Sequence, residues 1–218
     1  MPVSKTIVIS CAGMGTRLGI GSTKALLDID GKPLIIRQLE LLRAFDDVRI
    51  VVGYQMEKVM EVAGAYRPDL LFVLNHNYRN TGTGGSFSLA IRHARETVVS
   101  LDGDLLVHPD DLARVLGSDR ECVCGSVLGT EDPMRMKTLT QDGQVYGVGF
   151  SRQEGEYEWT GLAQVRRSRL TPGDRHVCDM MAPLLPLPME LIRTREIDTM
   201  ADYERAVAWV KGGYRETV

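Results

Sequence analysis

The chain has 218 residues, of which 44% are hydrophobic and 25% are charged, and its formal net charge is −3 at pH 7. This length is enough for one domain with a substantial core, and the composition is typical of a globular protein. The small negative charge argues against a broad nucleic-acid surface. No apolar run has the length of a membrane span and no signal-peptide core is present, so we expect no membrane partner and a cytoplasmic location.

The first half of the sequence alternates between strand and helix patterns. Strands are expected at residues 7–11, 48–53, 70–74 and 98–101, and helices from Pro33 onward and at residues 57–65, 86–95 and 112–116. This alternation predicts a mostly parallel central sheet covered on both faces by helices, a three-layer α/β/α sandwich. Ligands of such sheets bind beyond the carboxyl ends of the strands.

After Glu121 the pattern changes to a mixed β extension of the same domain. Strands are expected at residues 122–128, 134–140, 144–150 and 156–165, with a hairpin turn at Asp142-Gly143. Three prolines between residues 183 and 188 indicate a rigid connector. Residues 200–211 have the pattern of an amphipathic closing helix. We therefore interpret residues 1–218 as a single domain with two halves, residues 1–120 and 121–218.

The most informative segment is the loop from Ser10 to Lys24, which follows a short apolar strand. Gly13 and Gly15 leave backbone N–H groups unshielded, so that several can converge on phosphate oxygens. Arg17 adds a planar, permanently charged fork, and Lys24 adds a flexible point charge. Together these residues predict a loop that wraps a triphosphate.

Other interpretations of this loop fit less well. A dinucleotide-binding turn needs a helix that begins at the glycines, whereas Gly19, Gly21, Ser22 and Thr23 are poor helix formers. The acidic residue expected about twenty positions further on is also missing. A P-loop needs Gly-Lys-Ser/Thr after the glycines, and the sequence has none there. A surface loop with incidental charges is the remaining alternative.

Acidic residues follow the strand at residues 98–101 and precede the closing helix. Mg²⁺ takes one or two carboxylates together with waters and substrate phosphates. Asp104 and Asp198 are therefore candidate metal ligands, and Asp104 protrudes further beyond the strand than Asp102 does. The alternatives are a turn for Asp102 and Asp104 and a helix N-cap for Asp198.

A second glycine cluster and two acceptor candidates complete the set of candidate site residues. Residues 81–86 lead into a helix whose N-terminus could hold a base edge, a ribose or a phosphate; a plain loop with Ser86 as N-cap is the alternative. Lys137 shares one strand face with Arg135 and is a candidate for binding an anionic acceptor; a solvated edge strand is the alternative. Trp159 packs either against an acceptor or against the core.

These motifs resemble the nucleotidyltransferases that carry a glycine-rich signature of the type LAAGxGxR, then Lys, then GKPL. The matching segments are residues 10–18, 24–27, 31–34, 51–54, Asn75, 102–104 and 196–198. Gly53-Tyr54 and residues 196–199 look most similar to the phosphocholine and phosphonate cytidylyltransferases. The resemblance implies a Rossmann-like fold with a nucleotide-binding half at residues 1–120 and an acceptor- and metal-binding half at residues 121–218.

The resemblance also implies the reaction, which is transfer of a nucleoside monophosphate from a nucleoside triphosphate to a phosphate- or phosphonate-bearing small molecule. Pyrophosphate is released, Mg²⁺ is the cofactor and CTP is the favoured nucleotide. By the same resemblance Arg17 and Lys24 are catalytic, and Asp104 and Asp198 bind the metal. The implied nucleotide-binding residues are Ala12, Gly13, Met14, Gly15, Thr16, Gly84, Gly85, Ser86 and Asp102.

Three other functions remain open. A uridylyl- or guanylyltransferase acting on a sugar 1-phosphate would use the same motifs. A non-catalytic nucleotide-binding module needs no metal pair, and a dinucleotide-dependent oxidoreductase needs the helix and the acidic residue that the loop lacks. The sequence also leaves the oligomeric state open, with a homodimer among the candidates.

Overall fold

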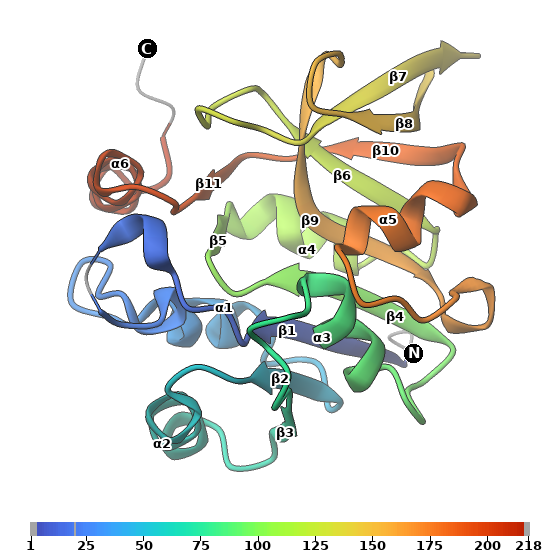
Figure 1. Ribbon diagram of the computed structural model, residues 1–218. Coiled ribbons are helices and arrows are strands. Elements are labelled where there is room, and N and C mark those ends of the chain that lie inside the picture. Colours follow the sequence, from blue (N-terminus) through green and yellow to red (C-terminus); the bar gives the residue numbers. More distant parts are fainter. Residues whose placement is uncertain (1–3, 20, 216–218) are drawn as a thin grey trace.

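A single mixed sheet organises the protein, whose computed structural model describes residues 4–19 and 21–215 apart from the side chain of Arg17 (Figure 1). Among the described residues this sheet has nine strands in the order β3-β2-β1-β4-β9-β6-β10-β8-β7. Its strands are β1 (Lys5–Cys11), β2 (Val48–Val52), β3 (Leu71–Leu74), β4 (Thr97–Asp102), β6 (Cys122–Ser126), β7 (Arg135–Gln141), β8 (Gln144–Ser151), β9 (Tyr157–Arg166) and β10 (Leu187–Leu191).

Helices cover both faces of the sheet, as the sequence predicts. They are α1 (Leu34–Leu41), α2 (Met56–Tyr66), α3 (Thr83–Ala90), α4 (Pro109–Leu116), α5 (Val177–Met181) and α6 (Met200–Lys211), with short 3-10 helices η1 (Thr16–Leu18), η2 (Lys24–Leu26), η3 (Arg167–Arg169) and η4 (Ala182–Leu184). None of these helices is long and apolar enough to cross a bilayer.

Alternation along β1 explains why two helix layers form. Ile7 and Ile9 pack into a core with α1, α2 and α4, whereas Val8 packs into a second core with α3 and α5. All three side chains are fully buried. Because successive strand residues point to opposite faces, a strand that is apolar at every position needs cover on both sides.

The topology confirms the predicted fold class. Strands β3, β2, β1 and β4 run parallel, and β9 joins β4 in the antiparallel sense. The second half adds a mixed set, including the β7–β8 hairpin, whose turn residues Asp142 and Gly143 have φ values of 50° and 75°. Paired positive φ values are typical of the tight turn that an Asp-Gly pair predicts.

Three strands and two helices differ from the sequence-based expectation, since the sequence pattern does not predict α5, and α3 is shifted toward the N-terminus. Pro188 lies in β10 rather than in a plain connector, at the end of the strand where only β8 pairs with it. Helix α3 begins at Thr83 with Gly82 as its N-cap, so Ser86 is not the N-cap. The short strands β5 (Leu105–Val107) and β11 (Thr194–Glu196) form a separate antiparallel pair that the sequence pattern does not reveal.

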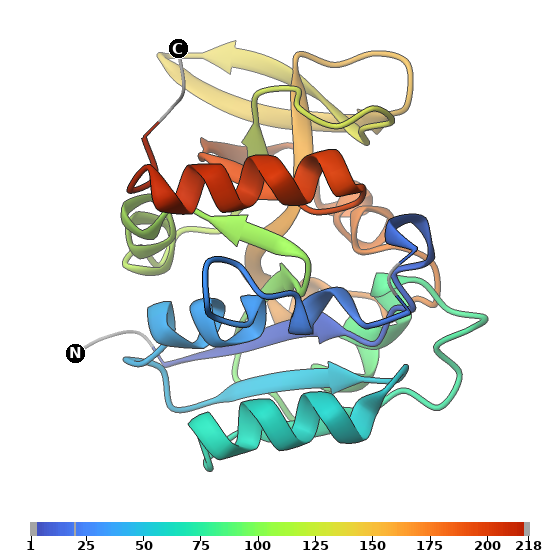
Figure 2. The ribbon, with the colours of Figure 1, turned by 90° about the vertical axis from the view of Figure 1, so that its left-hand side faces the viewer.

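Helix α6 lies beside the long loop that follows β1 (Figure 2). Ala206 and Trp209 of this helix share an apolar cluster with Leu27 and Ile29 of the loop segment. The Tyr203 hydroxyl donates a hydrogen bond to the carbonyl of Asp28, at 2.8 Å. The C-terminal helix therefore packs against the segment that follows the glycine loop.

Candidate active site

The candidate site begins where β1 and β4 end side by side. Gly103 N–H donates to the Ser10 carbonyl at 3.0 Å, so the turn after β4 folds against the end of β1. A Cβ at Gly103 would lie 2.6 Å from Cys11 Sγ and 2.7 Å from the Ser10 carbonyl oxygen. Only glycine permits this approach, which brings Asp102 and Asp104 to the glycine loop.

Lys24, Asp104 and Asp198 meet in one ionic cluster, although they come from three distant segments. The Lys24 ammonium lies 2.9 Å from Asp104 Oδ2 and also donates to Asp198 Oδ1. Their side chains are only 13%, 23% and 10% exposed. The structure thus places the loop lysine and both predicted metal ligands at the same edge of the sheet.

The two carboxylates keep the lysine charged. Burial alone would lower the pKa of the Lys24 ammonium, but the charges and hydrogen bonds of Asp104 and Asp198 outweigh it and raise the pKa above its ordinary value. Lys24 is therefore a permanent cation at neutral pH. It offers a fixed positive charge beside the loop that the sequence assigns to phosphate.

Glu196 joins this cluster, and the sequence-based prediction missed it as a site residue. Ligand oxygens of Asp104, Glu196 and Asp198 all lie within 4.8 Å of one another. Burial, together with the charges of Asp104 and Asp198, raises the pKa of Glu196 to about 9. The available signal was the spacing in Glu196-Ile197-Asp198, because residues two apart on an extended segment share a face.

Asp102 lies behind Asp104 against the backbone of β9. Its Oδ1 atom is buried and has no hydrogen-bond partner among the described residues. Gly161 has a φ of 75°, and a Cβ there would lie 2.1 Å from Asp102 Oδ2. Burial, followed by the charge of Asp104, raises the pKa of Asp102 to about 7.

This set of oxygen donors fits a hard divalent cation. Ligand oxygens of three acidic side chains lie within 4.8 Å of one another, so these groups would repel one another when all are ionised, and burial together with this repulsion raises the pKa of Glu196. The Oδ1 atom of Asp102, buried and without a hydrogen-bond partner among the described residues, is a further oxygen close by. Carboxylate oxygens are the protein ligands that Mg²⁺ prefers, and a divalent ion would relieve this repulsion.

Three cavities follow one another along this edge. The loop cavity, of about 190 Å³, is lined by Gly13, Gly15, Thr16, Thr23, Lys24 and Asp104 among others. The central cavity, of about 490 Å³, shares Gly13 and Asp104 with it. The outer cavity, of about 360 Å³, shares Trp159 and Glu196 with the central one. The ionic cluster therefore lies between a glycine-lined space and a larger space on the side of β9.

The residues of the first glycine loop divide into exposed and buried positions. Gly13, Gly15 and Thr16 line the loop cavity, and Met14 beside them is 39% exposed. Ala12 is buried, and its carbonyl accepts a hydrogen bond from Tyr54 N–H at 3.1 Å. The side chain of Arg17 lies outside the described residues, so its predicted role stays a prediction.

The second glycine cluster packs against the protein itself. Gly82 N–H and Gly84 N–H donate to the carbonyls of Asp174 and Arg175 at 2.8 and 3.1 Å, so these donors at the start of α3 are already used. Gly84, Gly85 and Ser86 are buried and line none of the three cavities, whereas Thr83 lines the central one. A role for the three near the base stays a prediction.

The two acceptor candidates lie in different places. Trp159 lines the central and outer cavities, is 8% exposed and packs edge-on against Phe150 with ring centroids 5.2 Å apart. It therefore serves the core and faces the cavities as well. Lys137 lies on the exposed β7–β8 hairpin, where its ammonium pairs with Glu154 at 2.5 Å. Lys137 lines none of the three cavities, so it is not brought to the site.

A glycine loop and a carboxylate cluster that meet at the carboxyl edge of such a sheet are typical of the ligand site of an α/β protein. The chain belongs to the family described as the MobA-like NTP transferase domain, whose family model matches residues 7–139.

Proteins from several bacteria share part of this sequence. The bifunctional protein GlmU of Aliarcobacter butzleri (strain RM4018) is 34% identical over 112 residues, which are 50% of this chain and 26% of that protein. The bifunctional protein GlmU of Pseudomonas paraeruginosa (strain PA7) is 29% identical over 189 residues, 85% of this chain and 38% of that protein. The chain thus spans well under half the length of these relatives.

Two solved structures share the fold over nearly the whole chain. One is the CTP:phosphocholine cytidylyltransferase of Streptococcus pneumoniae (LicC), with a TM-score of 0.72, 17% identity and coverage of 95% of this chain and 100% of that one. The other is a UDP-glucose pyrophosphorylase complexed with UDP-glucose, with a TM-score of 0.74, 16% identity and coverage of 96% and 100%. At such low identities the likeness shows the fold alone.

Proposed function

We propose that the protein transfers CMP from CTP to a small acceptor that carries a phosphate or phosphonate group, with release of pyrophosphate. The observation that carries this proposal is the cluster of Lys24, Asp104, Glu196 and Asp198 between the loop cavity and the central cavity. A triphosphate in the loop cavity would have its reacting end beside this cluster. An acceptor would approach from the central and outer cavities, next to Trp159.

The chemistry needs alignment and charge neutralisation more than a proton shuttle. An acceptor phosphate is largely ionised at neutral pH, so its oxygen can attack the α-phosphorus without a general base. The new P–O bond forms as the bond from the α-phosphorus to the bridging oxygen breaks, and pyrophosphate takes the electron pair. Lys24 and Arg17 would neutralise charge on the triphosphate, and the N–H groups of the glycine loop would orient it.

Magnesium belongs to this proposal as the cofactor. Asp104, Glu196 and Asp198 would hold it, and the bound ion would supply neutralisation of phosphate charge. Lys24 lies within the same cluster, so its ammonium would stay close to both the carboxylates and the phosphates. Asp102, at the end of β4 two residues before Asp104, would add a carboxyl oxygen behind the metal ligands.

The preference for CTP rests on the sequence similarity at Gly53-Tyr54 and residues 196–199, and the shared fold with a CTP:phosphocholine cytidylyltransferase is consistent with it. Uridylyl transfer to a sugar 1-phosphate is the second candidate, because a UDP-glucose pyrophosphorylase has the same fold. In either case the partners would be a nucleoside triphosphate and a small molecule, in the cytoplasm, without nucleic acid or membrane.

A pyrophosphate-release screen tests the proposal. Four nucleoside triphosphates are crossed with phosphocholine, aminoalkyl and hydroxyalkyl phosphonates, inositol phosphate and sugar 1-phosphates, all with Mg²⁺. We expect CTP to give the highest rate with one of the phosphate or phosphonate acceptors. Asp104→Asn should lower that rate at least about 100-fold. Asp142→Asn, in the exposed hairpin turn, is the matched control and should leave it unchanged.

Two results would overturn parts of this proposal. UTP with a sugar 1-phosphate as the best pair would select the second candidate. Tight CTP binding with no pyrophosphate release above the Asp104→Asn level for any pair would instead support a non-catalytic nucleotide-binding module.

A further inference from the structure

We propose that Gln38 and Asp202 are positioning residues, each of which fixes one of the two turns that present the metal-binding aspartates. This inference rests on the proposed function, since it concerns the same cation site. Both side chains are buried, at 3% and 5% exposed, and both come from helices outside the glycine loop. Neither is in the set of residues that the sequence pattern assigns to the site.

Gln38 of α1 holds the turn that carries Asp104. Its amide nitrogen donates to the carbonyl of Asp102 at 2.9 Å and to the carbonyl of Leu105 at 2.8 Å. These carbonyls stand on either side of Gly103 and Asp104. One buried amide group thus ties both ends of the turn to a helix, which leaves the turn little freedom to shift.

Asp202 of α6 does the same for the turn that carries Asp198. Its Oδ2 atom accepts from Asp198 N–H at 3.2 Å, from Thr199 N–H at 2.8 Å and from the Thr199 hydroxyl at 2.8 Å. Asp202 N–H returns a bond to the Thr199 hydroxyl at 3.2 Å, which completes a capping box. The other oxygen, Oδ1, pairs with Arg205. The helix cap therefore reaches one residue beyond the N-cap and fixes the backbone of Asp198.

The two held turns are also tied to each other. Ile197 N–H donates to the Asp104 carbonyl at 3.2 Å, and β11 pairs with β5 so that Glu196 lies opposite Leu105. The spacing of the carboxylates is consequently set by α1 on one side and α6 on the other. Outer partners that orient metal ligands typically affect metal affinity 10- to 100-fold when they are removed.

Direct binding of Mn²⁺ to the purified protein, followed by electron paramagnetic resonance, tests this inference without any transfer reaction. Gln38→Met removes the amide donors at nearly constant volume, and Asp202→Ala removes the capping acid. We expect each to weaken Mn²⁺ binding about 10-fold or more. Asp202→Asn retains an acceptor oxygen for the turn and should restore binding to within about threefold of the unmodified protein.

Two control variants separate positioning from general loss of structure. Leu39→Met is a buried, volume-conserving change next to Gln38, and Asp179→Ala removes the equivalent capping-box acid from α5. Both should bind Mn²⁺ like the unmodified protein. Circular dichroism and melting temperature verify folding of every variant. If Asp202→Ala does not fold, Asp202→Leu, which also lacks an acceptor oxygen but keeps more of the side-chain volume, takes its place, and Gln38→Met tests the other turn independently.

The inference is overturned if folded Gln38→Met and Asp202→Ala bind Mn²⁺ as tightly as the unmodified protein does. The metal site itself is overturned, and this inference with it, if the unmodified protein binds no more Mn²⁺ than Asp104→Asn. Pyrophosphate release, measured separately, shows whether the proposed reaction survives either outcome.

Discussion

Lys24 links two acidic residues of the candidate site. Its ammonium group bonds to both Asp104 and Asp198. Its raised pKa keeps it charged throughout the neutral range. A point charge on a flexible stem can follow phosphate oxygens as their charge redistributes, which a planar guanidinium does less readily.

Lys24→Met keeps the length of the side chain and removes the charge. We expect kcat/KM for pyrophosphate release to fall at least about 100-fold, because the charge on the triphosphate loses a partner close to the reacting phosphorus. Lys32→Met is the matched control, since Lys32 pairs with Glu40 at 2.6 Å and lines none of the three cavities. A Lys24→Met enzyme within threefold of the unmodified protein would contradict the assigned role.

Gly161→Ala tests the contact between β9 and Asp102. Alanine in the left-handed region costs about 1–2 kcal/mol, and its Cβ would lie 2.1 Å from Asp102 Oδ2. We expect a lower free energy of unfolding in urea and weaker nucleotide binding. Gly149→Ala in β8 is the comparison, because its Cβ would meet only Lys137 Cδ at 4.0 Å. Equal stability of the two variants would argue against a tight fit around Asp102.

At the residue scale, the sequence reveals those site residues that interrupt an apolar segment with a charge or a glycine. The loop glycines, Lys24, Asp104 and Asp198 stand out because charge and glycine interrupt apolar runs. Glu196 does not stand out, because it belongs to a short polar segment whose fold depends on pairing with β5. Asp202 resembles any acid in the first turn of a helix, and only the hydrogen bonds reveal what it holds.

At the scale of elements, glycine at the start of α3 allows this helix to lie close to the segment before α5. A Cβ at Gly84 would lie 2.8 Å from the His176 carbonyl oxygen, and one at Gly85 would lie 2.7 Å from Thr81 Cβ. The Thr83 hydroxyl also accepts from Val177 N–H at 3.2 Å. Close packing of the start of α3 against the segment before α5 therefore requires glycine at positions 82 and 84.

Gly84→Ala and Gly64→Ala should change stability in opposite directions. Both residues lie in helices, where alanine is normally favoured over glycine. A Cβ at Gly64 would make an ordinary contact with the Phe72 ring at 3.7 Å, so we expect a gain of about 0.5 kcal/mol. At Gly84 the backbone must move, and we expect a loss of about 1–3 kcal/mol. Urea unfolding of both variants measures the difference; a stabilised Gly84→Ala protein would contradict this account.

The elements that the sequence predicts best are those with a strong apolar period. Helix α6 and strands β1, β2 and β4 agree with the expectation to within two residues at each end. Strands β5 and β11, with three residues each, are too short to carry a pattern and exist through their mutual pairing. Strand β10 contains Pro188, which indicates a connector in sequence but is tolerated at the end of the strand.

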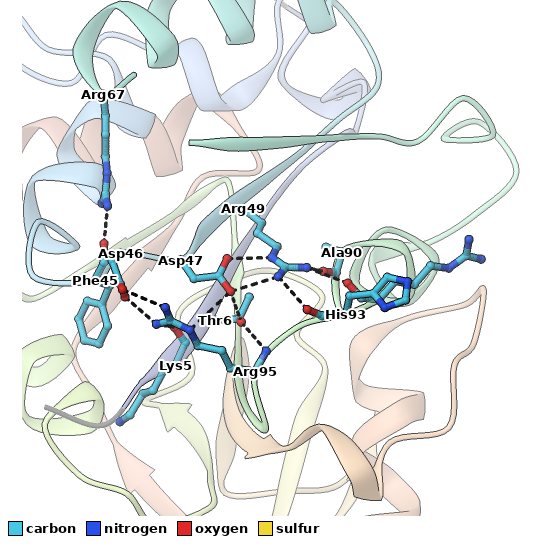
Figure 3. Close-up of polar contacts among 11 residues, drawn as sticks. Lys5, Thr6, Phe45, Asp46, Asp47, Arg49, Arg67, Ala90, His93 and Arg95 are labelled. Atoms are coloured by element: carbon cyan, nitrogen blue, oxygen red, sulfur yellow. Dashed lines mark hydrogen bonds and ion pairs between the residues drawn. The ribbon is translucent and has the colours of Figure 1, made fainter. Parts of the chain in front are cut away.

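At the scale of the whole molecule, the carboxyl ends and the amino ends of the parallel strands carry different groups of polar residues. The carboxyl ends carry the candidate site, and the alternating elements predict this placement from sequence. The amino ends carry a polar network that the sequence does not predict, because its members are single polar residues from separate strands and loops. Figure 3 shows Asp47 between Thr6 of β1 and Arg49 of β2. The Arg49 guanidinium also donates to the carbonyls of Ala90, the last residue of α3, and of His93 in the loop that follows.

Asp47 makes this network sensitive to acid. Burial alone would raise the pKa of Asp47, but hydrogen bonds from Arg49 and Thr6 outweigh it and hold the pKa below its ordinary value. A carboxyl whose pKa is lower in the folded state stabilises the fold fully above its ordinary pKa of about 3.9. That contribution is lost as the pH falls through the folded-state value. The network therefore strengthens the fold at neutral pH and weakens in acid.

Asp47→Asn should accordingly be destabilising at pH 7, by about 1–3 kcal/mol for the lost charge-assisted hydrogen bonds. The difference from the unmodified protein should shrink as urea unfolding is repeated at pH 5, 4 and 3. Asp46→Asn serves as the control, because the Asp46 side chain is 79% exposed where it pairs with Arg95. Its effect should be smaller and should vanish in high salt, since salt screens exposed pairs. A constant difference for Asp47→Asn from pH 7 to pH 3 would show that the charge of Asp47 does not stabilise this end of the sheet.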